Sequence, residues 1–408
     1  MVVQVAQEIE KQVLMINITD KSQCCGCSAC AQRCPKQCIS MQSDEEGFLY
    51  PKADGSVCID CGLCEKVCPI INQNDEREPL AVYAAKNADD AVRMQSSSGG
   101  LFTLLAEQMI GQGGVVFGAR WDADWSVRHD CVDRKENISK FRSSKYLQSI
   151  IGDCYVKTEK FLKQGRKVMF TGTPCQIAGL KHFLRKDYEN LLAVEVICHS
   201  VPSPGVWQQY LSEKLQNMGL RKSEIQQISF RDKSTGWKAY SFVIKDKSGN
   251  EYRELSSKNT FMRGFLADLY TRPSCQVCVA KHLKSGSDIT LGDWWGIDSL
   301  MPEIDDDRGV SAVTVNTLKG SWALRDLNVQ LYSVSYDALV KYNSAIIKSA
   351  AIAKNRNAFF QQDGRKFDKK IGKLACAPFS IIRVVKCVLH KVFPTSMVKF
   401  FKYQIVRS

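Results

Sequence analysis

One cysteine motif occurs twice near the start of this chain and restricts how its first seventy residues can fold. The first copy is Cys24-x2-Cys27-x2-Cys30-x3-Cys34-Pro35, and the second is Cys58-x2-Cys61-x2-Cys64-x3-Cys68-Pro69. Two residues between successive cysteines let a tight loop bring three thiols around one centre. Ten of the 18 cysteines fall between Cys24 and Cys68. We therefore expect this segment to form around shared metal centres rather than around an apolar core.

The doubled motif has the spacing of bacterial ferredoxins, which hold two 4Fe-4S clusters. The fourth cysteine of each copy crosses to the other cluster in such repeats. The spacing therefore predicts one cluster on Cys24, Cys27, Cys30 and Cys68, and a second on Cys58, Cys61, Cys64 and Cys34. Two zinc sites built from the same thiolates are the alternative, but zinc needs only four ligands and does not explain the repeat. Cys25 and Cys38 lie outside it and are interpreted as bystanders, as are Cys131, Cys154, Cys376 and Cys387.

Composition limits the compartment and the class of protein. The chain has 408 residues, 44% of them hydrophobic and 24% charged, which is typical of globular proteins with two or three domains. No apolar run is long enough to span a membrane, and the first residues lack a signal-peptide pattern. Crowded thiols in a reducing compartment hold metal more often than they form disulfides. We therefore expect a cytoplasmic metalloprotein.

The middle of the chain alternates between strand and helix patterns. A polar linker at 72–79 closes the cysteine-rich region. The strands expected after it are 81–85, 115–117, 167–170, 192–197, 289–291 and 310–315, and the helices are 101–110 and 176–184. This alternation predicts an α/β domain with a partly parallel sheet, and a turn at 247–250 predicts a hairpin insertion over 226–255. The expected domains are 1–75, 79–155, 156–345 and 346–408.

Four further cysteines stand in loops of the α/β region. Cys175 lies at a strand-to-helix turn, Cys198 ends a strand, and Cys275 and Cys278 form a C-x2-C pair. Taken singly, such residues are equally well interpreted as buried free thiols, a zinc site or a redox pair. Together they offer four thiols, which would suit a third 4Fe-4S cluster. Spacing alone leaves these alternatives open.

Several ordered motifs resemble one known family. They are Ser97-Ser98-Gly99-Gly100, Ser144-Lys145-Tyr146-Leu147-Gln148-Ser149, Gly172-Thr173-Pro174-Cys175-Gln176, Cys198-His199-Ser200-Val201-Pro202, Arg272-Pro273-Ser274-Cys275 with Cys278, and Leu291-Gly292-Asp293-Trp294-Trp295-Gly296. In these motifs the chain is similar to the beta subunits of coenzyme F-420 hydrogenases and dehydrogenases. The similarity runs from about residue 24 to residue 315. Ser200 is a departure, since the family usually has glycine after Cys-His.

The resemblance implies a protein that contains FAD and exchanges hydride with a soluble partner and single electrons with its clusters. It also implies a third 4Fe-4S cluster on Cys175, Cys198, Cys275 and Cys278. The cofactor-binding residues expected on this basis are Ser97, Ser98, Gly99, Gly100, Lys145, Tyr146, Gln148, Ser149, Gly172, Thr173, Pro174, Gln176, Gly292 and Asp293.

The residues themselves agree with a flavin, because a hydride must be split before one-electron clusters can accept it. The Ser/Gly loop at 96–100 before a helix suits a pyrophosphate, although a plain helix cap is the alternative. Lys145 is either a phosphate partner or an exposed lysine, and Asp293 either binds a ribose or flavin edge or caps a turn. No G-x-G-x-x-G follows the first strand, so Rossmann-type nicotinamide binding is not supported. His199 is the best titrating candidate, but we interpret it first as a structural histidine, and no catalytic residue is assigned.

The charge of the chain is concentrated at its C-terminal end. Residues 346–408 carry 14 Lys or Arg against two acids, out of a net charge of +13 for the whole chain. The pattern over 381–402 is basic and amphipathic, which is typical of a peripheral helix on an anionic inner-membrane surface or of an ordinary C-terminal helix with a solvated basic face. No aromatic platform or known module supports nucleic-acid binding.

The sequence therefore predicts an iron–sulfur flavoprotein oxidoreductase, or one component of such an enzyme, with two or three 4Fe-4S clusters and FAD. Its partner is expected to be a redox protein or a small-molecule hydride donor or acceptor. The competing hypotheses are a non-catalytic electron carrier that lacks flavin and a membrane or partner adaptor.

Overall fold

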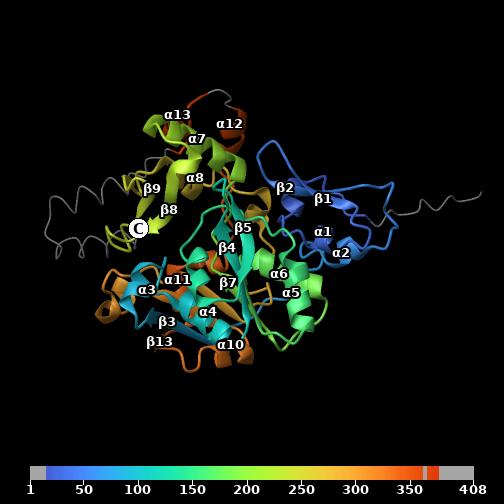
Figure 1. Cartoon of the computed structure of the whole chain (residues 1–408), viewed down its shortest axis with the longest axis horizontal. Helices are drawn as coiled ribbons and strands as arrows, with labels where there is room; N and C mark the ends of the chain where they lie inside the picture. Colours follow the sequence, from blue (N-terminus) through green and yellow to red (C-terminus); the bar gives the residue numbers. More distant parts are fainter. Residues whose placement is uncertain (1–14, 362–364, 376–408) are drawn as a thin grey trace, which may run out of the picture.

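The computed structural model describes residues 15–361 and 365–375. The cysteine-rich region comes first and holds η1 (Lys21–Gln23), α1 (Ala29–Arg33), α2 (Leu63–Lys66) and one antiparallel hairpin. Its strands, β1 (Ile39–Ser43) and β2 (Leu49–Ala53), pair from Ile39 opposite Ala53 to Ser43 opposite Leu49. The whole region lies against one side of the larger body, as the blue ribbon of Figure 1 shows.

The body is built on an eight-stranded mixed sheet with the order β13-β3-β12-β11-β7-β6-β4-β5. The strands are β3 (Ala81–Asn87), β4 (Val115–Trp121), β5 (Val127–Val132), β6 (Val168–Gly172), β7 (Leu191–Val196), β11 (Ile289–Asp293), β12 (Ser311–Val315) and β13 (Val329–Ser333). Strands β4, β6, β7 and β11 are parallel, while β12 runs antiparallel to both β11 and β3. The carboxyl ends of β3, β4, β6, β7 and β11 therefore meet along one edge.

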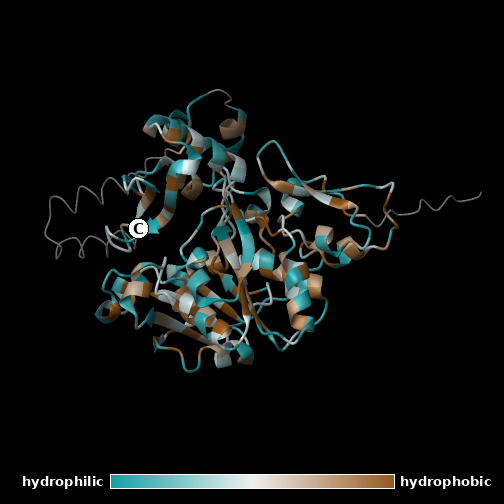
Figure 2. Ribbon diagram, viewed as in Figure 1, coloured by the Kyte–Doolittle hydropathy of each residue, from teal (hydrophilic) through white to brown (hydrophobic). Residues whose placement is uncertain are grey.

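Helices cover both faces of this sheet because successive strand residues point to opposite faces. One face packs on α4 (Leu101–Gly111), η2 (Lys135–Lys140) and α10 (Leu318–Ala323). The other packs on α5 (Cys154–Lys163), α6 (Pro174–Leu184) and α11 (Tyr336–Tyr342). Figure 2 shows hydrophobic and hydrophilic residues mixed along these helices, as expected where one side of a helix is buried. The expected α/β architecture is thus present, with a sheet that is mixed rather than purely parallel.

The predicted hairpin insertion is larger than a hairpin. Strands β8 (Ile225–Asp232), β9 (Ser241–Asp246) and β10 (Glu251–Leu255) form a separate three-stranded antiparallel sheet with β9 in the middle. The turn at 247–250 joins β9 to β10 as expected. The pattern missed the extra pairing because β9 is almost continuously buried and does not alternate. This sheet packs with α7 (Pro204–Met218), α8 (Thr260–Leu266) and α13 (Phe367–Leu374) in an aromatic-rich core.

Short elements complete the body. They are α3 (Asp90–Met94), η3 (Lys222–Glu224), η4 (Pro273–Val277), α9 (Ile297–Leu300), η5 (Pro302–Ile304), η6 (Ser344–Ile346) and α12 (Arg356–Gln361). Helices α12 and α13 belong to the segment expected to be a basic tail, and Phe359, Phe367 and Ile371 pack into the aromatic core. The amphipathic pattern over 381–402 lies outside the described residues. Over the described ranges, no helix combines the length and the apolar character that a membrane span requires.

Candidate functional site

Two cavities in the cysteine-rich region bring together the cysteines of the doubled motif. Cys34, Cys58, Cys61 and Cys64 line one cavity, and Cys24, Cys27, Cys30 and Cys68 line the other. In both cavities the fourth thiol comes from the opposite copy of the motif, as the crossed assignment expects. The chemistry and number of these donors fit an iron–sulfur cluster.

The two cavities differ in their access to solvent. Cys27 is buried in the inner cavity, whereas Cys61 is exposed at the outer one. Burial raises the pKa of Cys30 to about 12. Thiols bind iron as thiolates, so loading a centre at the inner cavity requires release of protons. Across residues 15–361 and 365–375, no three His, Cys, Asp or Glu side chains converge tightly enough to hold a single metal ion.

A third set of thiols gathers at the carboxyl edge of the sheet. Cys175 opens α6 directly after β6, Cys198 follows β7, and Cys275 and Cys278 lie in and just after η4. Each of these four thiols lies within electrostatic range of the other three. Burial raises the pKa of Cys198 to about 12 and raises that of Cys275 as well. The ammonium group of Lys281 opposes this shift at Cys198, and its Nζ donates to the Cys198 carbonyl.

Cys25 lies between the inner cavity and the third set of thiols. Its thiol is within hydrogen-bonding reach of Cys175 on one side and of Cys27 on the other. It is 6% exposed and belongs to the same apolar cluster as Cys27 and Cys175. Gly179 of α6 also lies against Cys27, since a Cβ atom there would stand 2.9 Å from the Cys27 sulfur. The Cys25 thiol therefore lies between Cys27 of the doubled motif and Cys175 of the third set.

Arg272 holds the cysteine-rich region on the body. This fully buried guanidinium donates to the carbonyls of Cys24 and Leu49 at 2.7 and 2.9 Å, and to Oε1 of Gln148 at 2.8 Å. Gln148 in turn donates from Nε2 to the Cys25 carbonyl at 2.9 Å. The planar group also stacks over Tyr50, with 4.2 Å between its central carbon and the ring centroid. Gln148, expected to contact a cofactor, thus bridges the two parts of the chain.

The other expected cofactor-binding residues fall into two groups along the carboxyl edge. Near Cys175, the group is Ser149, Gly172, Thr173, Pro174 and Gln176, and their polar atoms are largely paired with one another. Thr173 and Gln176 form a capping box at the start of α6, with 3.0 Å between the Thr173 nitrogen and Oε1 of Gln176. Nε2 of Gln176 donates to Oγ of Ser149, which contacts Nδ1 of His129, both at 2.9 Å. At this turn Thr173 and Gln176 therefore cap the helix.

The second group surrounds Arg231 at the ends of β3 and β11, and comprises Ser97, Ser98, Gly99, Gly100, Tyr146, Gly292 and Asp293. Arg231 is 3% exposed and donates to the Asp293 carboxylate at 3.0 Å, to the Ser97 carbonyl at 3.1 Å and to the Tyr146 hydroxyl at 3.2 Å. It also lies over Tyr240 and Trp295, and its Nε atom has no hydrogen-bond partner among the described residues. Asp293 accepts from Trp237 Nε1 at 3.2 Å.

Packing inside the protein explains the glycines of this group. A Cβ atom on Gly99 would stand 2.3 Å from the Ala85 carbonyl oxygen, and one on Gly292 would stand 2.6 Å from Ile197. Gly100 has a φ of +85° and precedes α4, whose first turn has no side-chain cap in the described structure. Glycine at 99 and 292 is therefore needed for the fold whether or not a pyrophosphate binds. The uncapped first turn of α4 remains suited to an anion.

Two lysines beside these loops have no ion pair with an acidic side chain within the described ranges. Nζ of Lys233 donates to the carbonyls of Arg93, Ser98 and Arg308 at 2.9, 2.6 and 2.7 Å, and burial lowers the pKa of this lysine to about 7. Lys145 is half-buried, donates to main-chain carbonyls, and has its pKa lowered to about 7 by burial. An anion bound beside either lysine would favour its charged form.

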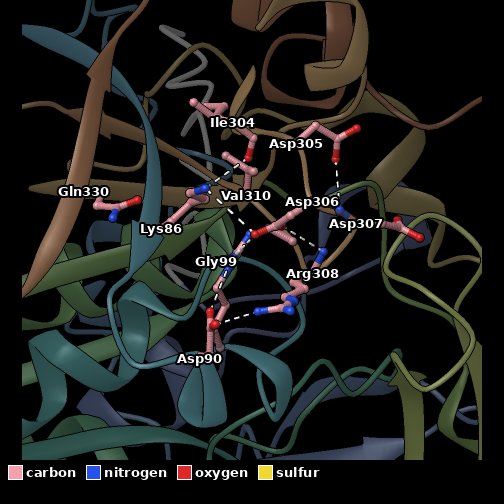
Figure 3. A network of polar contacts seen from close by, with 12 residues as sticks. Lys86, Asp90, Gly99, Ile304, Asp305, Asp306, Asp307, Arg308, Val310 and Gln330 are labelled. Carbon is pink, nitrogen blue, oxygen red and sulfur yellow. Dashed lines mark hydrogen bonds and ion pairs between the residues drawn. The ribbon is translucent and has the colours of Figure 1, made fainter. Parts of the chain in front are cut away.

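Polar contacts hold the loop over residues 305–310 in place beside β3 and α3 (Figure 3). Nζ of Lys86 donates to the Ile304 carbonyl at 3.1 Å, and Arg308 pairs with Asp90. Gly309 lies against the loop at 96–100, since a Cβ atom there would stand 2.7 Å from the Ser98 carbonyl oxygen. The loop over residues 305–310 therefore packs against the serine-glycine loop at 96–100.

His199 lies at the rim of the third thiol set. Its Nε2 atom is 3.0 Å from Oδ1 of Asp268, and its ring packs edge-on against Phe265. Oδ2 of Asp268 accepts from the Ala351 amide at 3.1 Å. The ring is therefore oriented by a carboxylate, in keeping with the structural interpretation of this histidine.

Sequence reasoning missed several residues of these sites. Arg231 lies near the end of β8 and Lys233 directly follows it, so two basic residues flank an acid, and this was the available signal. Arg272 was noted only as part of a motif, and Cys25 was set aside as a bystander. Their roles depend on contacts between residues more than a hundred positions apart, such as Arg272 with Cys24, and no local pattern reports them.

Comparisons with known proteins agree with both parts of the fold. Residues 165–334 match the family described as the C terminus of the coenzyme F420 hydrogenase/dehydrogenase beta subunit, and residues 23–70 match the 4Fe-4S dicluster domain. One of the subunits of the F(420)H(2) dehydrogenase of Methanosarcina mazei is 25% identical over 189 residues, covering 43% of this chain and 53% of that protein. An uncharacterised protein of Methanocaldococcus jannaschii is 24% identical and is covered over 56% of its length. The chain thus spans about half the length of these relatives.

Other similarities concern either the N-terminal part or the fold alone. A 7Fe ferredoxin of Hydrogenibacillus schlegelii is 35% identical over 65 residues, which are 15% of this chain and 77% of that protein. A chain from the xenon-derivatised F420-reducing [NiFe] hydrogenase complex of Methanosarcina barkeri aligns with a TM-score of 0.46 and 17% identity. That alignment covers 70% of this chain and 92% of the other.

Proposed function

We propose that this chain is the electron-transferring subunit of an oxidoreductase, because residues 165–334 match the C terminus of coenzyme F420 hydrogenase/dehydrogenase beta subunits and residues 23–70 match the 4Fe-4S dicluster domain. In this proposal twelve cysteines hold three 4Fe-4S clusters, and the Arg231 group with its neighbouring loops holds FAD. The clusters supply one-electron transfer, and the flavin supplies exchange between hydride and single electrons.

One observation carries the proposal, namely a series of neighbouring thiols that leads from the body to the surface of the dicluster domain. The third set of thiols contacts Cys25 through Cys175, and Cys25 contacts Cys27 of the inner cavity. Cys68 of the inner set and Cys64 of the outer set also lie within electrostatic range of each other. The series ends at the exposed Cys61. Such an arrangement suits electron transfer between a buried redox site and a partner protein that docks at Cys61.

The assignment of a cluster to the third set is based on the number and chemistry of its thiols. Four thiols from three loops lie within electrostatic range of one another, and Lys281 provides a positive charge that opposes the cost of burying thiolates. One C-x2-C pair together with two separate cysteines supplies the four thiolates that a 4Fe-4S cubane needs. We therefore assign Cys175, Cys198, Cys275 and Cys278 as ligands within the proposal.

The support for FAD is of a different kind. The Arg231 group lies beyond the carboxyl ends of β3 and β11, the edge at which open α/β sheets bind ligands. The uncapped start of α4, Lys233 and Lys145 offer donors for the pyrophosphate. The aromatic pair Trp237 and Trp295, stacked with ring centroids 5.2 Å apart, borders the same group. F420 or another hydride carrier would then be the small-molecule partner.

Iron, sulfide and flavin contents of protein purified without oxygen test the proposal. We expect about twelve iron atoms and one FAD per chain. About eight iron atoms without flavin would instead favour an electron carrier, a function that the internally paired Thr173, Gln176 and Ser149 side chains also allow. No iron after anaerobic reconstitution would overturn both.

Single cysteine variants separate the third cluster from the dicluster domain. Cys198→Ser should lower the iron content by about four atoms and leave the two N-terminal clusters intact. Cys154→Ser is the matched control, because this thiol is only 2% exposed but belongs to none of the three sets. Equal iron contents in both variants would remove the third cluster from the proposal.

A further inference from the structure

Ser200 contains a buried hydroxyl that finds no partner among the described residues. The residue is 7% exposed, and its Oγ atom is fully covered without a hydrogen bond to any of those residues. An unpaired hydroxyl in such a place carries a desolvation penalty of roughly 1–3 kcal/mol, so buried hydroxyls are almost always paired. The family that the chain resembles usually has glycine at this position. The Ser200 hydroxyl therefore either destabilises the protein or donates a hydrogen bond to an acceptor outside the described protein atoms.

The surroundings of Ser200 indicate which acceptor that is. The preceding loop residues include Cys198, two positions earlier. The backbone amide of Val201, one position later, already lies close enough to the Cys275 sulfur to favour its thiolate. Arg272 anchors the same stretch, because its backbone amide donates to the Val201 carbonyl at 3.0 Å. Ser200 thus lies on a loop that the Arg272 contact fixes, between Cys198 in sequence and the Val201 amide that reaches Cys275.

We propose that the Ser200 hydroxyl donates a hydrogen bond to a sulfur atom of the third cluster and thereby raises the reduction potential of that cluster. This inference rests on the proposed function, since it needs a cluster on the third set. Hydrogen bonds to cluster sulfur atoms stabilise the reduced, more negative state. Ser200 acts as a tuning residue and is not itself a ligand.

In this proposal, Ser200 brings the reduction potential of the third cluster closer to the potentials of the two N-terminal clusters. Burial raises the pKa of the Cys198 and Cys275 thiols, and burial disfavours added negative charge. A donor at Ser200 offsets part of that effect without adding a formal charge. A glycine at the same position would leave the cluster with the Val201 amide but without the hydroxyl.

The test is a redox titration followed by electron paramagnetic resonance on anaerobic holoprotein. Ser200→Ala keeps the Cβ atom and removes the hydroxyl. We expect the reduced-to-oxidised ratio of the third cluster at a given potential to fall about tenfold, a shift of about 59 mV toward lower potential. The signals of the two N-terminal clusters should keep their midpoints. Ser200→Thr keeps the hydroxyl and should restore the wild-type midpoint.

Controls distinguish the possible failures. Ser241→Ala removes another buried hydroxyl, bonded to Thr235 at 3.0 Å in the separate three-stranded sheet, and should leave all midpoints unchanged. Wild-type protein with only two clusters would overturn the third cluster and this inference together. Three clusters with identical midpoints in wild type and Ser200→Ala would overturn this inference alone, as would a Ser200→Thr midpoint equal to that of Ser200→Ala. If Ser200→Ala loses the cluster, the Ser200→Thr and Ser200→Gly midpoints decide, and equal values for those two would contradict the inference.

Discussion

Arg272 donates from Nη1 to Oε1 of Gln148 across 2.8 Å, in the buried seam where the dicluster domain meets the α/β body. The same guanidinium reaches the carbonyls of Cys24 and Leu49. Charge-assisted hydrogen bonds of this kind are the strong ones in proteins, and leaving their acceptors unpaired is costly. The position of the inner thiols relative to Cys175 therefore depends on one side chain of the body.

Arg272→Met should loosen the dicluster domain. Removal of three buried hydrogen bonds should lower the free energy of unfolding by roughly 3–5 kcal/mol and expose the linker at 72–79 to protease. Limited proteolysis under anaerobic conditions measures this exposure. Arg33→Met is the control, because Arg33 also spans the seam, to Glu159 at 3.2 Å, but is partly exposed. Its loss should cost about 1 kcal/mol or less, and equal cleavage of the two variants would contradict the role given to Arg272.

Gly179→Ala should disturb the inner cluster. The added Cβ atom would stand 2.8 Å from the Cys27 Cβ atom and 3.0 Å from the Tyr155 hydroxyl, so the two parts of the chain must separate slightly. Overpacking of this kind costs roughly 1–3 kcal/mol, and we expect a changed paramagnetic signal from one N-terminal cluster. Gly111→Ala, at the end of α4 with no described heavy atom within 4 Å of the new Cβ, should be neutral or slightly stabilising. An unchanged Gly179→Ala spectrum and melting temperature would rule out this close approach.

Cys61 and Cys38 should differ sharply as ligands. Both line the outer cavity, and the Cys38 sulfur is 3.3 Å from that of Cys34, so proximity alone does not choose between them. The doubled motif assigns Cys61, and not Cys38, as the ligand. Cys61→Ala should therefore lose about four iron atoms, whereas Cys38→Ala should retain the wild-type content. The reverse result would show that Cys38 replaces a motif cysteine at this centre.

His129 should make the stability of the protein depend on pH. Burial lowers the pKa of its imidazole from 6.5 to about 4, while the unfolded chain binds the proton at its ordinary pKa. The unfolded state therefore binds more protons between these two values, and stability falls as the pH drops from about 6.5 to about 4. At pH 5 this contribution is about 2 kcal/mol relative to pH 7.

Anaerobic melting temperatures at pH 7 and pH 5 measure the His129 effect. His129→Gln removes the titrating ring and should narrow the difference between the two temperatures. His282→Gln, which replaces a histidine whose side chain is 40% exposed, serves as the control and should keep most of the wild-type difference. A His129→Gln variant with the full wild-type difference would show that other groups cause the acid sensitivity.

The α/β alternation was readable in advance because its periods are local. The expected strand at 192–197 and helix at 101–110 correspond to β7 (Leu191–Val196) and α4 (Leu101–Gly111). Edge strand β13 and the third strand of the small sheet were missed, because their pairing depends on partners distant in sequence. The cofactor role expected for Gln148 rests on motif similarity and stays a prediction, while the bonds of its side chain to Arg272 and to the Cys25 carbonyl became visible only in the structure.

What the sequence by itself determined is the dicluster domain, since the spacing of eight cysteines and the crossing of the fourth in each copy are properties of the local chain. What only the tertiary structure decided is how that domain meets the body: Cys25 beside Cys175, Gly179 against Cys27, and Arg272 bonded to Cys24 from 248 residues away. The physical reason is that the spacing of the cysteines can be read directly from the sequence of each motif. Contacts between domains arise from side chains that folding brings together, and no spacing rule encodes them.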